Sequence, residues 1–505
     1  MKKSLAAKIF SVMLAAVLLC TPLLSLTASA AKKSQNYWPL INVHGFFSCD
    51  IHADKEDKNS EVICPWATND ILSCVADCVP ALAEFAITKD YDKFGDSILP
   101  RVRELFEPSF CDPDGTVSNG SGVYFEYPKP ENINKYSQLS FRYDWRLDPF
   151  EIAAQLNDFI DYVLECSGCD KVALSCHSLG GVIALTYLTV YGNEKIQGIA
   201  FNTTAIYGEA YTGQLFSGEI EITKDALVNF LAYVLDENDF EILLNGIIDI
   251  LAKAGLVDAI ANLGNDIVDN LLDKTIPEVL MPLFCRWLTL WAMCPDDYID
   301  AAYSYMFSRS EPSVNYTELQ KKIQQYNTVV RANREKTLKA FDEVGRVVVV
   351  SRYGYSSIPL TDKWYNISDG VVDSAYSSFG ATTAPFGTKF DDEYLAKVDP
   401  EFISPDKTVD ASTCLFPEKT WFIKDYPHAT THDPLDDMMY TLLFNPKEEA
   451  TVDTYDQYPR FLKYIKATDA VVPDDNVVIK SNIFSEIFKN ILRFFEKIVN
   501  FLFYR

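Results

Sequence analysis

The stretch that most constrains the fold of this chain is Lys171–Gly181, an apolar run that leads into Ser178 and then into a segment of helical pattern. A strand–serine–helix turn of this kind holds the serine on a strained backbone, so the residues two before and two after it must be small. Those residues are Cys176 and Gly180. Glycine is common at both positions, and cysteine is compact enough to replace it. The pattern predicts that Ser178 is a nucleophile at the end of a strand.

Such a nucleophile needs two backbone N–H donors for the negative oxygen that develops when a carbonyl is attacked. One donor is expected from Leu179, which follows the serine at a helix N-terminus. The other is expected from Phe46, because the His44-Gly45 pair before it ends a short apolar strand and glycine leaves the backbone free to aim an N–H. Neither role depends on a side chain.

The acid that should orient a histidine is sought in the loop after Arg346–Arg352, where four consecutive valines are typical of a strand buried on both faces of a parallel sheet. Asp369 is followed there by a glycine, in a tight turn that could present its carboxylate. Asp373 and Asp362 are the competitors. Chain order, with serine first, then acid, then histidine, favours Asp369.

The general base must be one of two histidines. The chain has five histidines. His44 and His177 lie inside the two motifs already described, and His52 lies upstream of the serine, so His428 and His432 remain. His428 directly follows a predicted strand, whereas His432 abuts Asp433-Pro434, which resemble a helix N-cap and first helical residue. The position at the strand end favours His428 as the base.

A family resemblance is carried by Phe141–Pro149, which contains Tyr-Asp-Trp-Arg. It resembles the signature of the lecithin:cholesterol acyltransferase and lysosomal phospholipase A2 family, within the α/β-hydrolase superfamily of lipases, and the motifs follow in the same order from Trp38 to about Phe444. The resemblance implies an α/β-hydrolase fold with a Ser, Asp, His triad. Matched by motif, Ser178 is the nucleophile and Asp369 the acid.

The same resemblance bears differently on the histidine. In that family the catalytic histidine often directly precedes a helix, a pattern that favours His432. Both His428 and His432 therefore stay open as the base. No cofactor and no metal is expected. Cys166–Cys169 has the spacing of a zinc or redox pair but no second pair to match it, so a local disulfide or free thiols are expected there instead.

The pattern of strands and helices predicts a doubly wound, mainly parallel α/β core made of residues 31–204 and 346–470. Residues 205–345 are mostly helical in pattern and far longer than a crossover needs, which predicts a large cap or lid. Its apolar stripes favour acyl chains or other apolar substrates over sugars or peptides. Helices are also expected near 70–85, 94–106 and 149–167. The expected strands lie near 40–43, 139–143, 172–175, 197–202, 347–351 and 420–423.

The N-terminus predicts export. Residues 1–30 carry three lysines, an apolar core and a small-residue end, as a secretory signal peptide does, with cleavage after Ala30. The net charge of −26 argues against nucleic-acid partners and favours solubility outside the cell. Disulfides are permitted there. Of twelve cysteines, Cys20 lies in the signal segment and Cys176 in the turn, which leaves ten for up to five disulfides.

The C-terminus is expected to be a separate segment. Residues 471–505 are predicted to form a linker and then an amphipathic helix over 481–505, which is locally basic in an acidic chain. Such a helix could dock on a membrane, a lipid surface or the cell surface. Packing onto the hydrolase core or a partner chain is the alternative.

Together these features predict a secreted serine hydrolase that cleaves carboxylic esters, of lipids or other apolar acyl groups, through an acyl-enzyme. One alternative is an acyltransferase that moves the acyl group to an alcohol, which no single residue separates from a lipase. A second is a non-catalytic binding module on a hydrolase fold. It is disfavoured because all the expected catalytic residues occur in order.

Overall fold

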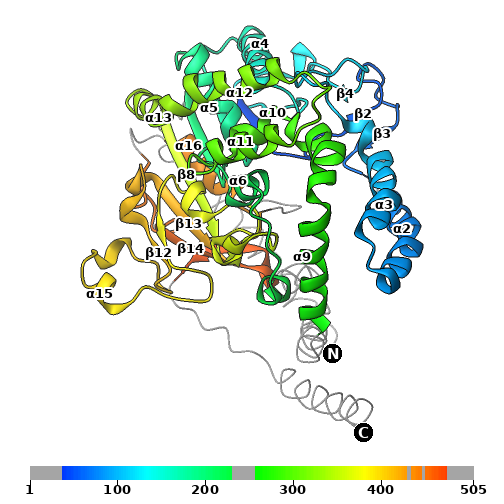
Figure 1. The fold of residues 1–505 in the computed structure, drawn as a ribbon. Coiled ribbons are helices and arrows are strands. Elements are labelled where there is room, and N and C mark those ends of the chain that lie inside the picture. Colours follow the sequence, from blue (N-terminus) through cyan, green and yellow to red (C-terminus); the bar gives the residue numbers. More distant parts are fainter. Residues whose placement is uncertain (1–36, 67, 230–255, 429–433, 446–449, 475–505) are drawn as a thin grey trace, which may run out of the picture.

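An eight-stranded sheet lies at the centre of the structure, a computed structural model that describes residues 37–66, 68–229, 256–428, 434–445 and 450–474 (Figure 1). The strand order is β15-β14-β13-β8-β7-β6-β1-β5. Their bounds are β1 Leu40–Val43, β5 Gln138–Phe141, β6 Val172–His177, β7 Ile196–Asn202, β8 Arg346–Tyr353, β13 Thr420–Lys424, β14 Phe461–Ile465 and β15 Ala470–Pro473. All neighbours are parallel except β14 and β15. The predicted mainly parallel sheet is confirmed.

Both faces of the sheet are buried, which explains the runs of apolar residues in its strands. Alternate residues of β8, such as Val347 and Val349, face one apolar cluster, and Val348 and Val350 face another. The first cluster includes α4 (Pro149–Ser167), α5 (Leu179–Tyr191) and α13 (Arg334–Asp342). The second includes α16 (Asp436–Leu443). The sheet is therefore doubly wound, as predicted.

The six expected strands and the expected helix from Pro149 are all present, with ends shifted by one or two residues in most cases. Two strands of the sheet, β14 and β15, were not predicted. Val471 was expected to begin a linker, but it pairs with Tyr464 as part of β15, so the sheet extends to Pro473. β15 is the outermost strand of the sheet and pairs only with β14. A proline is tolerated at such an edge because its missing N–H faces no further strand.

A helical lobe stands beside the sheet. The hairpin of α2 (Thr68–Thr88) and α3 (Tyr91–Phe106) projects from the body next to α9 (Leu256–Thr275), in blue and green in Figure 1. The lobe has its own small core of Phe85, Phe94 and Leu271. Lys274 of α9 also forms ion pairs with two aspartates of α3. Residues 68–106, which belong to the predicted hydrolase core by sequence position, pack with the inserted helix α9.

The remaining inserted helices belong largely to the body of the protein. They are α6 Ala210–Ser217, the π-helical segment η4 Ile276–Cys285, α10 Leu288–Met293, α11 Ile299–Ser308 and α12 Thr317–Val329. Leu288, Leu319 and Phe341 share the core cluster that covers the first face of the sheet. α13 packs against α5 and β8. The insertion is thus helical as predicted, but its second half is a layer of the body.

Short elements complete the described chain, and several expectations fall outside it. The short strands and helices are β2 Ile51–His52, β3 Val62–Cys64, β4 Gly122–Val123, β9 Tyr355–Ser356, β10 Ile367–Ser368, β11 Thr382–Thr383, β12 Val409–Asp410, α14 Ser374–Ser377 and α15 Asp392–Leu395. The signal segment 1–30, His432 and the tail helix 481–505 lie outside the described residues. No described helix is long and apolar enough to cross a membrane.

The cysteines carry free thiols in the described part of the chain, so the expected disulfides are not present there. Cys166 and Cys169, the pair with two intervening residues, are also free. Six of the others, among them Cys64, Cys111 and Cys176, are buried in the main apolar cluster or at its edge, where they pack as small apolar side chains.

The Tyr-Asp-Trp-Arg segment joins several parts of the structure. The Arg146 guanidinium lies 2.6 and 2.9 Å from the two carboxylate oxygens of Asp144 and donates to the Ser109 carbonyl at 3.1 Å. The Trp145 indole donates to the Cys49 carbonyl at 3.1 Å. The Arg146 carbonyl accepts from the Leu288 N–H at 3.1 Å. This segment therefore connects the loop after β1, the loop after α3 and the inserted helices.

Breaking the Asp144–Arg146 ion pair should destabilise the fold. Arg146 is fully buried and the Asp144 side chain is 8% exposed, so Arg146→Met would leave an unpaired buried carboxylate. We expect a loss of about 3–5 kcal/mol in the free energy of unfolding, measured by urea denaturation. Lys397→Met removes an ion pair whose side chains are 67% and 82% exposed and should cost less than about 0.5 kcal/mol. Equal losses in the two variants would contradict this role for Arg146.

Candidate active site

Ser178 lies on a strained turn between β6 and α5. Its backbone has φ 55° and ψ −123°, a left-handed conformation that is costly for a residue with a side chain. The turn is held by the Ser178 N–H, which donates to the Asn202 carbonyl at 3.3 Å. The Ser178 carbonyl accepts from the N–H groups of Gly181 and Ala205, both at 3.2 Å. The turn at Ser178 has the conformation expected of a nucleophile elbow.

Three glycines make this turn sterically feasible. A Cβ atom on Gly180 would lie 2.0 Å from the Val43 carbonyl oxygen, and one on Gly181 would lie 2.4 Å from the Thr204 side chain. On Gly45 it would lie 2.7 Å from the Cβ of Ser178. The requirement for a small residue two positions after the serine therefore comes from its contact with β1.

The position two before the serine tolerates a side chain. Cys176 is the fifth residue of β6, opposite Val43 of β1 and Phe201 of β7, and its side chain is fully buried in the main apolar cluster. Burial raises the pKa of its thiol far above the ordinary range. Cys176 therefore packs as an apolar residue beneath the turn and is not a second nucleophile.

The two expected oxyanion donors lie close to Ser178 along the chain or in space. Leu179 begins α5, so its N–H belongs to the first helical turn, which has no acceptor within the helix. Phe46 follows Gly45, whose backbone is packed against Ser178. The loop that carries Phe46 is held by the Tyr143 hydroxyl, which donates to the His44 carbonyl. Both N–H groups are thus on segments fixed beside the serine.

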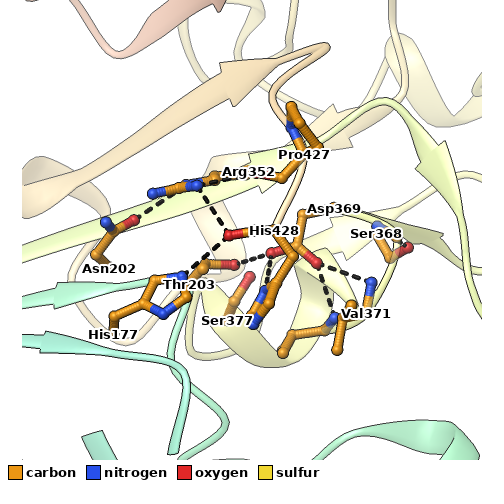
Figure 2. A network of polar contacts seen from close by, with 12 residues as sticks. His177, Asn202, Thr203, Arg352, Ser368, Asp369, Val371, Ser377, Pro427 and His428 are labelled. Carbon is orange, nitrogen blue, oxygen red and sulfur yellow. Dashed lines mark hydrogen bonds and ion pairs between the residues drawn. The ribbon is translucent and has the colours of Figure 1, made fainter. Parts of the chain in front are cut away.

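Asp369 is a buried carboxylate with four donors. It follows β10, where Gly370 adopts a φ of 97° and allows the chain to fold back on the side chain. One oxygen accepts from the Val371 and Val372 N–H groups at 3.0 and 2.8 Å. The other accepts from the Thr203 hydroxyl at 2.5 Å and lies 2.7 Å from Nδ1 of His428 (Figure 2).

The charged form of Asp369 is favoured in spite of burial. Burial by itself would raise the pKa of this carboxyl group. The nearby His428 and the hydrogen bonds from His428, Thr203 and the Val372 N–H outweigh it, so the pKa of Asp369 is below its ordinary value. The carboxylate is therefore ionised at neutral pH and able to hold the histidine in one orientation.

The structure brings His428, of the two histidine candidates, to the acid. Its ring faces the Asp369 carboxylate, and its side chain is 11% exposed. The main-chain N–H of His428 donates to the main-chain carbonyl of Asp369 at 2.9 Å. The ring also lies 4.7 Å from that of His177, the residue before the nucleophile. His428 is thereby close to the turn that carries Ser178. His432 lies outside the described residues.

The competing aspartates have other contacts. Asp362 accepts from the side chain of Gln214 at 2.6 Å. Asp373 accepts from the Ala210 N–H at 2.8 Å and is 1% exposed. Burial raises the pKa of Asp373 to about 6, and the charge of Asp369 acts in the same direction. Both contact the start of the helical insertion and not His428.

Glu209 is a third buried acid, near Asp369 and Asp373. Its side chain accepts from the Thr212 hydroxyl, and its N–H donates to the Met293 carbonyl at 3.0 Å. Burial raises the pKa of Glu209 to about 8, and the charges of Asp373 and Asp369 add to that shift. Glu209 is therefore mostly protonated at neutral pH, which lets it lie near two other acids.

Sequence reasoning missed the supporting residues of this site. Thr203, which donates to Asp369, has a left-handed backbone with φ 46° and donates its N–H to the Val350 carbonyl. The run Asn202-Thr203-Thr204 at the end of a buried strand was the available signal, since polar residues at the carboxyl end of a parallel strand often serve a site. Among the described residues, no group of three or more His, Cys, Asp or Glu is placed to hold a metal ion.

This arrangement defines an α/β-hydrolase fold: a doubly wound sheet, a serine turn after an inner strand, and an Asp–His pair in loops that follow strands on one side of it. The sequence matches no family model and no curated protein. Among solved structures, the Tle4–Tli4 complex matches at 16% identity over 35% of this chain and 48% of that chain, with a TM-score of 0.20. This chain thus spans about half of that one.

Two further solved structures are similar over a larger share. The esterase RhEst1 from Rhodococcus sp. ECU1013 matches at 9% identity and a bromoperoxidase from Bacillus anthracis at 13%. In both cases the match covers 68% of this chain and 79% of the other, with a TM-score of 0.19. At such TM-scores these likenesses carry no argument about site or reaction, and the fold is assigned from the sheet and turn themselves.

The raised pKa of Glu209 predicts a pH dependence of stability. The folded state keeps a proton that the unfolded chain loses above about pH 4.3, so stability falls as pH rises from there to about 8. The slope from one group is at most about 1.4 kcal/mol per pH unit. Glu209→Gln should reduce the loss of unfolding free energy between pH 5 and 8, measured by urea denaturation. The exposed substitution Glu393→Gln is the control, and an unchanged slope in Glu209→Gln would refute the assignment.

Proposed function

We propose that this protein is a serine hydrolase that cleaves carboxylic esters of apolar acyl groups, with Ser178, His428 and Asp369 as its triad. The observation that carries the proposal is the Asp369–His428 contact of 2.7 Å, made beside the strained turn that holds Ser178. Chain order Ser, Asp, His is that of α/β-hydrolases. The Tyr-Asp-Trp-Arg resemblance to the lecithin:cholesterol acyltransferase and lysosomal phospholipase A2 family supports the same proposal.

In the proposed reaction the Ser178 hydroxyl attacks the ester carbonyl carbon while Nε2 of His428 takes its proton. The oxygen of the tetrahedral intermediate is stabilised by the N–H groups of Phe46 and Leu179. Collapse breaks the carbon–oxygen bond, and the leaving alcohol receives the proton from His428. Water, activated by the same histidine, then hydrolyses the acyl-serine and releases the carboxylic acid. Asp369 keeps Nδ1 protonated throughout.

The proposed preference for apolar acyl groups rests on the aromatic side chains around the oxyanion loop. The ring of Phe46 lies 5.1 Å from that of Trp145 and 6.4 Å from that of Trp287. Phe47, with 45% of its surface exposed, packs on Trp145 at 4.8 Å. Trp145 and Trp287, the latter from the helical insertion, are each 1% exposed. They therefore support the more exposed rings of Phe46 and Phe47, which form an apolar wall next to the site.

We further propose that the protein works outside the cell, as its N-terminal segment and acidic charge suggest, and that the tail helix serves at a lipid or cell surface. Secretion fits a mature chain that begins after Ala30. Cleavage in an exporting host, followed by N-terminal sequencing of the product, would test this part of the proposal separately from the chemistry.

A fluorophosphonate probe tests the nucleophile and the base. The wild-type protein should be labelled, and Ser178→Ala should abolish labelling, while Ser175→Ala, in the preceding strand β6, should not. His428→Ala should slow labelling by about 10²–10⁴-fold because the serine loses its general base. His52→Ala serves as the matched control, because His52 is outside the proposed site. His432→Ala tests the alternative base. If labelling depends on His432 and not on His428, the base is misassigned; labelling that survives Ser178→Ala overturns the mechanism.

Ester chain length tests the proposed substrate class. Against nitrophenyl esters from acetate to octanoate, kcat/KM should rise with chain length, since each buried methylene adds up to about 0.8 kcal/mol. Phe47→Ala should flatten this rise while acetate hydrolysis changes little, because its ring is 45% exposed and belongs to the apolar wall. A preference for acetate over octanoate in the wild-type protein would contradict the acyl-chain proposal.

A further inference from the structure

Arg352 is a buried cation beside the proposed triad. It lies near the end of β8, and its side chain is fully buried. Removing a guanidinium group from water costs several kcal/mol unless hydrogen bonds compensate for the loss. Because an apolar side chain of similar length would fill the same volume without that cost, the hydrogen bonds of Arg352 indicate what the charge is kept for.

Those hydrogen bonds lead to the loop that carries the histidine. Nη1 of Arg352 donates to the Pro427 carbonyl at 2.9 Å and to the His428 carbonyl at 3.1 Å. Nε donates to the side-chain oxygen of Asn202 at 3.2 Å (Figure 2). The guanidinium also stacks on the ring of Tyr426, 4.2 Å from its centre. One side chain thus connects β8, the end of β7 and the loop after β13.

Asn202 connects this contact to the nucleophile. Its main-chain carbonyl accepts from the Ser178 N–H at 3.3 Å, while its side chain accepts from Arg352. It is the last residue of β7 and lies opposite His177 in the parallel ladder. Asn202 therefore links the turn that carries Ser178 to Arg352, which in turn holds the loop that carries His428.

The backbone of His428 is held on both sides. Its carbonyl oxygen accepts from Arg352 and lies 3.1 Å from Nε2 of His177. A carbonyl oxygen has two lone pairs, so these two partners satisfy it. Its N–H donates to the Asp369 carbonyl, and Nδ1 faces the Asp369 carboxylate. Nδ1 is thereby engaged with Asp369, and Nε2 is the ring nitrogen that takes the proton of Ser178 in the proposed reaction.

The sheet alone does not fix this geometry. β13 ends at Lys424, so His428 lies four residues beyond the end of the strand, in a loop. Catalytic geometry is sensitive to such positions, since a displacement of about 1 Å can cost about 100-fold in rate. A loop at this distance from the strand needs side-chain contacts to reach that precision.

We propose that Arg352, together with Asn202, is a positioning residue that fixes the main chain at Pro427 and His428, so that the imidazole meets Ser178 and Asp369 at once. The inference rests on the proposed function, because it takes His428 as the base. Arg352 touches neither substrate nor reacting atoms in this scheme, and its proposed effect on the rate comes from the position that it gives to His428.

Arg352→Met tests the proposal against a matched arginine. Arg346, on the same strand, also donates to main-chain carbonyls, those of Leu443 and Asn445 at 2.6 and 2.8 Å, but at the opposite end of β8. We expect Arg352→Met to lower kcat for nitrophenyl octanoate by about 100-fold with KM unchanged. Arg346→Met should leave kcat within about threefold, and Arg352→Lys should recover part of the loss. Equal kcat values in the two methionine variants would overturn the proposal.

A double variant separates positioning from a general structural effect. In a His428→Ala background, Arg352→Met should not lower the residual rate further, because the group on which Arg352 acts is gone. A further 100-fold loss in that background would show that Arg352 acts by another route and would overturn the proposal. If Arg352→Met does not fold, Arg352→Lys and Asn202→Ala are compared in the same two backgrounds, and they decide by the same criterion.

The two proposals fail in different ways. If His428→Ala leaves fluorophosphonate labelling and ester hydrolysis unchanged, the assigned base is wrong and the positioning role falls with it. If His428→Ala removes activity but Arg352→Met behaves as Arg346→Met does, the proposed function stands and only the role of Arg352 is refuted.

Discussion

The contact between the end of β1 and the turn after β6 is the constraint on which the site depends. Gly180 lies so close to the Val43 carbonyl that no side chain fits between them, and Gly45 meets Ser178 in the same way. Both contacts follow from the parallel register in which Val43 lies opposite Cys176. The strained serine is therefore maintained by backbone packing, which resists relaxation because protein interiors are close-packed. The loop with Phe46 is brought beside the serine by the same contact.

Strand order then determines which loops meet. β6, β7, β8 and β13 are neighbours, so the segments after them lie at one edge of the sheet and bring Ser178, Thr203, Asp369 and His428 together. A buried carboxylate and a buried guanidinium are tolerated there because each is hydrogen-bonded by the loops it connects. Burial raises the pKa values of Glu209 and Asp373 in the same region, and the charges of neighbouring aspartates add to both shifts.

The inserted helices are joined to this core by the Tyr-Asp-Trp-Arg segment. Trp145 contacts Phe46 of the oxyanion loop and Trp287 of the insertion, and its carbonyl accepts from the Thr289 hydroxyl at 2.5 Å. The apolar wall and the oxyanion loop therefore share one support. The lobe of α2, α3 and α9 is different, because its small core contains only its own residues and it stands beside the sheet. The structure thus combines a site supported by the main apolar cluster with a helical lobe that has its own small core.

Local patterns in the sequence predict the class of the sheet, six of its strands and the serine turn, and chain order predicts Asp369 as the acid. These follow from local chemistry: buried strands need continuous apolar runs, and a strained turn needs small residues. Only the tertiary structure brought His428 to Asp369, moved the edge of the sheet to Pro473 and joined residues 68–106 to the inserted helix. It also revealed Thr203, Asn202 and Arg352. Their contacts join residues more than 70 positions apart in most cases, and no local pattern encodes such pairs because strand order alone brings them together.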